Sequence, residues 1–140
     1  LDAQGRSRTR VFEEEIQPLL KKSGIGSMAF SPLDTGHLAP DRSTSPPLSA
    51  LVKTIDQVAV QLGVARAAIC VAWVMHQPGV TSVLCGAESC EHIDANLGGS
   101  ELQLPVEALA QLTMARQIFC AAQESAHCKS RDDKLGDQKT

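Results

Sequence analysis

Apolar residues recur at helical spacing over much of this chain, and the spacing predicts where the helices lie. Over 51–62, apolar residues recur on one face, which is typical of an amphipathic helix. The segment 65–76 is apolar on nearly every side, as expected of a buried helix. Helical spacing, charge order or a capping residue predicts three further helices, over 11–22, 89 to about 97, and 105 to about 122.

Residue types at the helix ends agree with these boundaries. Gly24 and Gly63 follow the last residues of two predicted helices, where glycine takes the left-handed conformation at no steric cost. Ser89 can cap the start of a helix, and Pro105 suits the first helical position. Beyond the last predicted helix, 124–140 is polar, so we expect a frayed or disordered tail after a domain of residues 1–123.

Two short apolar runs, 25–30 and 80–84, predict buried strands, because both are too short for helices and the second is rich in β-branched residues. Pro32 ends the first run. Strands that alternate with helices imply parallel βαβ units. Two strands cannot close a sheet, so their faces need partners that this chain does not contain.

Composition narrows the class of protein. The chain has 140 residues, of which 43% are hydrophobic, and 13 Lys and Arg stand against 16 Asp and Glu. This is the balance of one soluble domain, and the lack of excess basic charge argues against a nucleic-acid partner. No apolar run approaches the roughly 20 residues of a membrane helix, and no signal segment opens the chain, so we expect no membrane insertion.

The five cysteines and the missing tyrosine bear on location and chemistry. Five is an odd number and no CxxC pairing occurs, which favours reduced thiols in a cytoplasmic protein over disulfides or a metal site. The sequence has no tyrosine. A mechanism that needs a tyrosine hydroxyl as proton donor therefore cannot be carried out by this chain alone.

Several segments resemble the aldo-keto reductases. Residues 24–33, GIGSMAFSPL, resemble the seventh barrel strand of that family with the turn after it, and 80–87, VTSVLCGA, resemble the eighth strand. Residues 89–97, SCEHIDANL, resemble the helix at the adenosine end of the cofactor, and 58–77 the helices between the strands. Within that family, the sequences of these segments are most similar to those of bacterial aldo-keto reductases and potassium-channel β subunits.

The resemblance implies an α/β fold, the C-terminal part of a (β/α)8 TIM barrel, incomplete, with about two strands and four to five helices. It implies NADP as cofactor and carbonyl reduction by hydride transfer. The family's catalytic Tyr, Lys, Asp and His lie on earlier strands and loops. None of those positions falls in this chain, so we expect no catalytic residue here and little activity from the chain alone.

The resemblance assigns the first turn to the nicotinamide and pyrophosphate. Phe30 matches the aromatic that stacks on the nicotinamide, and Ser31 and Leu33 match positions that meet the pyrophosphate. Relatives carry a lysine near Asp41, and the adjacent Arg42 can replace it. The alternatives are a core aromatic that ends a strand and an ordinary strand-ending turn.

The second turn is assigned to the adenosine phosphate, with Gly86 at its start. The helix that follows presents free N–H groups to a phosphate, which favours NADP over NAD. Glu88 and His92 stand where relatives carry cationic or polar side chains, and Asn96 can bind adenine. For His92, a solvated helix residue is the alternative.

Three functional hypotheses follow from the resemblance. The first is the cofactor-binding portion of a reductase that acts on a small carbonyl substrate once the missing part of the barrel is present. The second is a fragment of a potassium-channel β-subunit-like regulator, with a channel or a second copy as partner. The third is a truncated product without independent function, which the open sheet edges favour.

Overall fold

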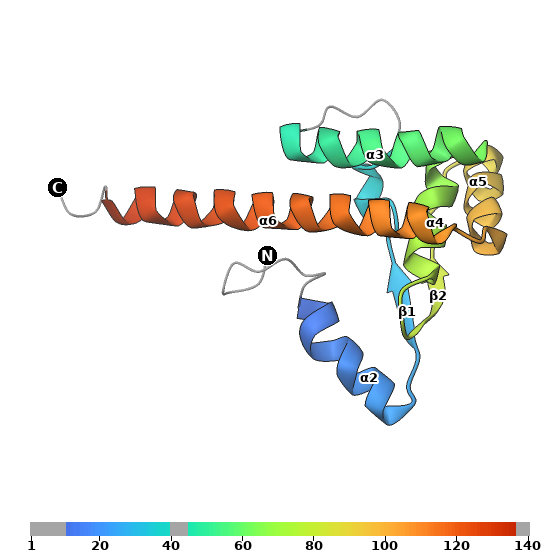
Figure 1. Ribbon diagram of the computed structural model, residues 1–140, viewed down its shortest axis with the longest axis horizontal. Helices are drawn as coiled ribbons and strands as arrows, with labels where there is room; N and C mark the ends of the chain where they lie inside the picture. The colour runs from blue at the N-terminus through green and yellow to red at the C-terminus, as the bar shows by residue number, and fades with distance from the viewer. Residues whose placement is uncertain (1–10, 40–44, 137–140) are drawn as a thin grey trace.

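The structure, a computed structural model, describes residues 11–39 and 45–136, with side chains up to residue 127. Helices predominate, and two short strands lie between them (Figure 1). In chain order the elements are η1 (Phe12–Ile16), α2 (Gln17–Ser23), β1 (Ser27–Phe30), η2 (Asp34–Gly36), α3 (Pro46–Leu62), α4 (Arg66–Met75), β2 (Val80–Leu84), α5 (Cys90–Glu101) and α6 (Val106–Gly136).

The two strands pair in parallel, as predicted. Phe30 is opposite Leu84 and Ala29 is opposite Val83, while α3 and α4 form the connection between the strands. Parallel neighbours need such a crossover because the chain must return to the same end of the sheet. The βαβ unit expected from the sequence is therefore confirmed.

The prediction that both strands are buried is wrong for this chain by itself. Side chains alternate across the strands, and one face of the pair carries Met28, Phe30 and Leu84, all of which are exposed. Helix α4 packs against β2, but among the described residues no second layer covers the face that holds Phe30. The apolar pattern predicted a buried environment that this chain does not itself provide.

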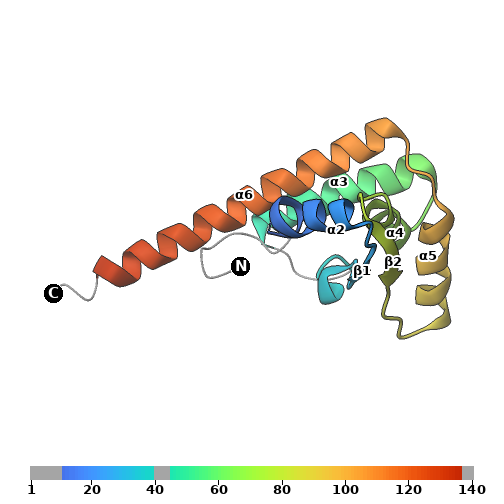
Figure 2. The ribbon, with the colours of Figure 1, turned by 90° about the horizontal axis from the view of Figure 1, so that it is seen from below.

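The core lies where α3, α4 and α6 meet. Val58 of α3 and Ile69 of α4 are fully buried, and Leu112 of α6 packs with them. Helices α3 and α6 run side by side in both views, while α5 lies against α4 (Figure 2). The helix predicted to be apolar on all sides is confirmed, since residues 68–72 of α4 are all buried.

Most predicted helix ends are confirmed. Gly24 and Gly63 both have φ of 65° and end α2 and α3, and Ser89 caps α5. Helix α3 begins at Pro46, five residues before the start that the sequence predicted. Proline fits the first turn of a helix, where its missing N–H has no partner to lose, so the prolines there start the helix.

Helix α6 is longer than predicted. The sequence predicted an end near Ala122, but the helix continues to Gly136 and extends beyond the core (Figure 1). Residues 123–136 contain no proline, and their only glycine is the last residue, so nothing in the sequence interrupts the backbone hydrogen bonding. The polar composition of these residues predicted a tail, but their helix propensity prevails. The division into a domain and a tail stays a prediction.

Within the described ranges, no single helix is long and apolar enough to cross a membrane. The bent pair α3 and α4, at 98° to each other, passes that test of length and composition when taken together. Its deeply buried residues form the core described above.

Candidate functional site

The carboxyl ends of β1 and β2 place two turns side by side. Phe30 and Leu84 end the strands opposite each other, and the Ser31 N–H donates a hydrogen bond of 3.2 Å to the Leu84 carbonyl. The turn after β1 (residues 31–39, the first turn) and the turn after β2 (residues 85–89, the second turn) therefore start from one point. The carboxyl edge of parallel strands is where ligands bind in α/β folds.

The first turn has an unusual backbone. Ser31, Asp34 and Thr35 have φ of 53°, 49° and 52°, in the left-handed region that side chains other than glycine rarely adopt. Internal hydrogen bonds hold it: the N–H groups of Asp34 and Gly36 donate to the carbonyls of Ser31 and Leu33 at 2.9 and 3.0 Å. The turn is thus folded on itself at the edge of the sheet.

Phe30 stands at the start of this turn with 75% of its surface exposed, while Ser31 and Leu33 are half-buried. These three residues, which the resemblance assigned to the nicotinamide and pyrophosphate, are adjacent in space. Arg42 and Asp41 lie outside the described residues. The roles of Phe30, Ser31 and Leu33 toward a cofactor stay predictions.

The second turn is tied to α5 by Asn96. This side chain is only 8% exposed, and its Nδ2 donates a hydrogen bond of 3.2 Å to the Gly86 carbonyl. Its Oδ1 is buried without a hydrogen-bond partner. A buried acceptor that lacks a donor is costly and rare in folded proteins. Gly86 and Asn96, predicted from different motifs, are therefore brought into direct contact.

The start of α5 is built by side chains that hydrogen-bond the backbone. Ser89 Oγ accepts from the His92 N–H at 3.3 Å, and His92 Nδ1 accepts from the Glu88 N–H at 3.4 Å. A hydrogen bond from the Ser89 hydroxyl, together with the backbone N–H of Glu91, lowers the pKa of the Glu91 carboxyl. Glu88, Glu91 and His92 are all exposed.

The second turn and the first half of α5 together carry a negative charge. Residues 85–97 include Glu88, Glu91 and Asp94 and contain neither lysine nor arginine. The first turn of a helix leaves N–H groups without intrahelical partners, which suits an anion, although the Ser89 cap here already takes the His92 N–H. Backbone and side chains therefore act in opposite directions on a phosphate.

One residue that reaches the site was not predicted from the sequence. Arg66, at the start of α4, donates from Nε and Nη2 to the Asp56 carboxylate at 2.6 and 2.8 Å, and from Nη1 to the Leu38 carbonyl at 3.1 Å. The signal that could have identified it is that Arg66 is the single charged residue of an otherwise apolar helix. Its partners could not be predicted, since they lie ten and 28 residues away.

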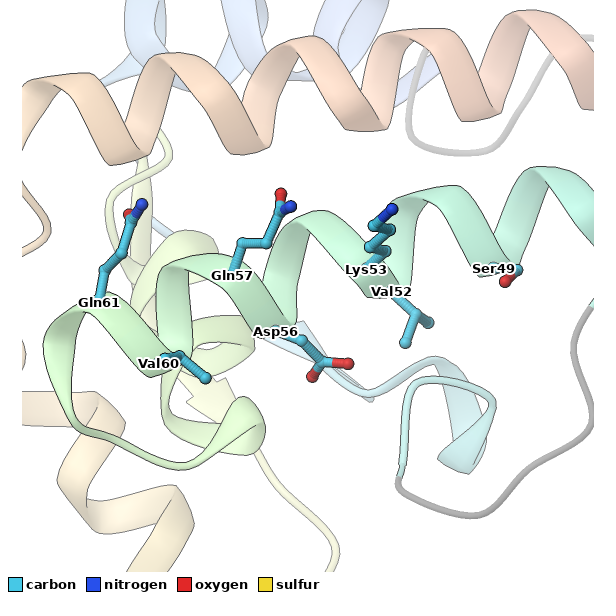
Figure 3. Close-up of a pocket in the computed structure, with 7 residues that line it drawn as sticks. All are labelled: Ser49, Val52, Lys53, Asp56, Gln57, Val60 and Gln61. Atoms are coloured by element: carbon cyan, nitrogen blue, oxygen red, sulfur yellow. The ribbon is translucent and has the colours of Figure 1, made fainter.

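Two hollows bear on the choice of the candidate site. An apolar cavity of about 110 Å³ lies beneath the first turn, whose Pro32 and Leu38 line it together with Ile69 and Trp73. A wider hollow of about 580 Å³ follows the outer face of α3 (Figure 3). All of its lining residues belong to α3, namely Ser49, Val52, Lys53, Asp56, Gln57, Val60 and Gln61. A single helix face brings no convergent groups together, so the two turns remain the better candidate site.

Comparisons with known proteins agree with this geometry. A model of the aldo/keto reductase family matches residues 6–117. A thermostable aldo-keto reductase, solved in complex with the inhibitor epalrestat, aligns with a TM-score of 0.60 and 23% sequence identity, over 75% of this chain and 35% of that chain. The fold is therefore an incomplete α/β barrel, and the chain spans about a third of that reductase. Because the family match covers most of its residues, this chain belongs to the aldo/keto reductase family.

Proposed function

We propose that this chain is the C-terminal, cofactor-binding portion of an NADP-dependent aldo-keto reductase. The observation that carries the proposal is the pair of turns at the carboxyl edge of β1 and β2, joined by the hydrogen bond from Ser31 to Leu84. Family membership supports the assignment of this edge to a nicotinamide dinucleotide. The reduced cysteines predicted from the sequence support a cytoplasmic location.

The residues of both turns fit parts of a dinucleotide. The exposed ring of Phe30 suits stacking on a flat ring such as nicotinamide. The N–H groups at the start of α5 suit a phosphate. The Nδ2 of Asn96 donates to the Gly86 carbonyl, so this buried side chain holds the second turn in place beside the cofactor. Together these features support a cofactor held along the edge of the sheet.

NADPH supplies a hydride to the carbonyl carbon of a substrate in this class of reaction. In our proposal the residues of this chain bind the cofactor and orient it: Phe30 fixes one face of the nicotinamide, and the two turns hold the phosphates. The resemblance implies a tyrosine hydroxyl as the proton donor to the carbonyl oxygen, and that tyrosine must come from outside this chain, since the sequence has none. We therefore expect the chain alone to bind cofactor without turnover.

The rest of the barrel has a surface to join. Met28 and Leu84 are exposed on one face of a two-stranded sheet with open edges, which supports packing against further strands. We propose that these strands, from a longer polypeptide or a second chain, supply the catalytic residues and complete a pocket for a small carbonyl compound.

The negative charge of the second turn suggests a specific test. The Glu88 carboxylate opposes a 2′-phosphate, so Glu88→Lys should raise the affinity for NADPH about tenfold and change that for NADH little. His92→Arg should act in the same direction. Glu101→Lys, at an exposed position at the far end of α5, makes the same charge change as a control. Affinities are measured by titration of cofactor fluorescence.

Each outcome of this titration has a defined meaning. A gain for NADPH alone, absent from Glu101→Lys, supports a 2′-phosphate at the second turn. An equal gain for NADPH and NADH, or an equal gain from Glu101→Lys, would show general charge attraction and contradict the proposed NADP site.

A further inference from the structure

The first turn is held from outside by a side chain of α4. The Nη1 of Arg66 donates to the Leu38 carbonyl at 3.1 Å, while Nε and Nη2 donate to the Asp56 carboxylate of α3. One guanidinium thus joins α3, α4 and the far end of the turn. The Arg66 side chain is only 19% exposed, so water and salt screen these contacts less than they would on an open surface.

The backbone of the turn needs such a restraint. Ser31, Asp34 and Thr35 all have positive φ, and residues in such conformations persist only where their surroundings fix them. At one end the Ser31 N–H is tied to β2. At the other end the Leu38 N–H donates to the Leu33 carbonyl at 3.2 Å, and the Leu38 carbonyl accepts from Arg66. Arg66 therefore closes the restraint at the end that is not attached to the sheet.

We propose that Arg66 is a positioning residue that holds the first turn in a form ready to receive the dinucleotide, without touching the dinucleotide itself. This inference rests on the proposed function. The planar guanidinium is suited to the task, because its fork makes two parallel bonds to Asp56 and leaves a third donor aimed at Leu38. A lysine at this position has a single ammonium and cannot reproduce that geometry.

The chain contains a matched control for this arginine. Arg116 of α6 pairs with Glu13 of η1, with an Nη2–Oε2 distance of 2.7 Å, and its side chain is 17% exposed. Both arginines form a half-buried ion pair with a carboxylate. Arg66→Lys and Arg116→Lys therefore make the same chemical change. Arg116 also lines the cavity beneath the first turn and lies 6.0 Å from the centre of the Trp73 ring, but of the two arginines only Arg66 donates a hydrogen bond to the first turn.

The experiment is hydrogen exchange on the full 140-residue chain and both variants. The amides of Asp34, Gly36, His37 and Leu38 donate hydrogen bonds within the turn, so they report its order. In Arg66→Lys we expect these amides to exchange about tenfold faster, while amides in the middle of α3 and α4 keep their protection. In Arg116→Lys the turn amides should be unchanged.

The results separate this role from a purely structural one. Equal acceleration in both variants, acceleration that spreads through α4, or turn amides already unprotected in the unaltered chain would overturn the inference. NADPH affinity is the second measurement, and it should fall by a similar factor in Arg66→Lys alone. Absence of NADPH binding by the unaltered chain would contradict the proposed function, whereas the exchange data decide independently whether Arg66 orders the turn.

Discussion

Burial changes the chemistry of individual side chains, and Cys70 is the clearest case. The structure describes four free cysteines, of which Cys70 and Cys120 are buried and Cys85 and Cys90 are exposed. Burial raises the pKa of Cys70 to about 12, and partial desolvation raises the pKa of the more exposed Cys85. Cys70 is therefore a neutral core residue, not a reactive thiol.

The raised pKa of Cys70 makes stability depend on alkaline pH. The unfolded chain releases this proton near pH 9, while the folded chain keeps it to about 12. Below pH 9 the Cys70 thiol is protonated in both the folded and the unfolded chain, so it costs no stability. Between these two values only the unfolded chain has released the proton, and the free energy of unfolding should fall by about 1.4 kcal/mol per pH unit. Cys70→Ala should lack this component. Urea unfolding of both proteins from pH 8 to 11, under reducing conditions, gives the two slopes, and equal slopes would refute the assignment.

The sequence predicted residues whose chemistry acts locally. Gly24, Gly63 and Ser89 are recognisable because their side chains, or the lack of one, determine the nearby backbone. The left-handed conformations of Ser31 and Thr35 were not predictable, since no glycine marks them and distant contacts hold them. The contact from Arg66 to Leu38 was missed for the same reason.

Among the elements, α4 and α5 illustrate how one glycine permits close packing. A Cβ on Gly99 would lie 2.6 Å from the Ala68 carbonyl oxygen and 2.7 Å from the Val71 Cβ. The backbone of α4 cannot yield easily at such distances. The neighbouring Gly98 has nothing within 4 Å of the equivalent position.

The two glycines should therefore respond in opposite directions to one methyl group. Gly99→Ala should lower the free energy of unfolding by about 1–3 kcal/mol, because the helices must separate. Gly98→Ala should raise it by up to about 1 kcal/mol, because alanine favours the helix. Urea denaturation of the two variants measures this difference. Equal effects on stability would contradict the described contact between α4 and α5.

Helices and strands were largely predictable from periodicity, whereas their burial and length were less so. The apolar runs predicted β1 and β2 at nearly the observed residues, but exposure depends on what covers a strand, which the run does not encode. Helix α6 continues past its predicted end because polar residues without proline do not stop a helix. For the site, the sequence indicated both turns but not the contact of Asn96 with Gly86.

At the scale of the whole molecule, the chain supplies one edge of a larger fold. It spans 35% of a solved aldo-keto reductase, and its sheet has two strands with an exposed apolar face. The two turns that the resemblance assigns to the cofactor lie at one edge of this sheet, while the sequence contains no tyrosine. We therefore assign cofactor binding to this chain, and proton transfer to the rest of the barrel.

The most direct test of that account is a titration of the purified 140-residue chain with NADPH, followed by cofactor fluorescence, with circular dichroism on the same sample. We predict a helical chain that binds NADPH saturably, more weakly after Phe30→Ala and unchanged after Leu19→Ala, a similarly exposed residue on α2. A folded chain that binds no NADPH, or binds it equally well without Phe30, would contradict the central claim.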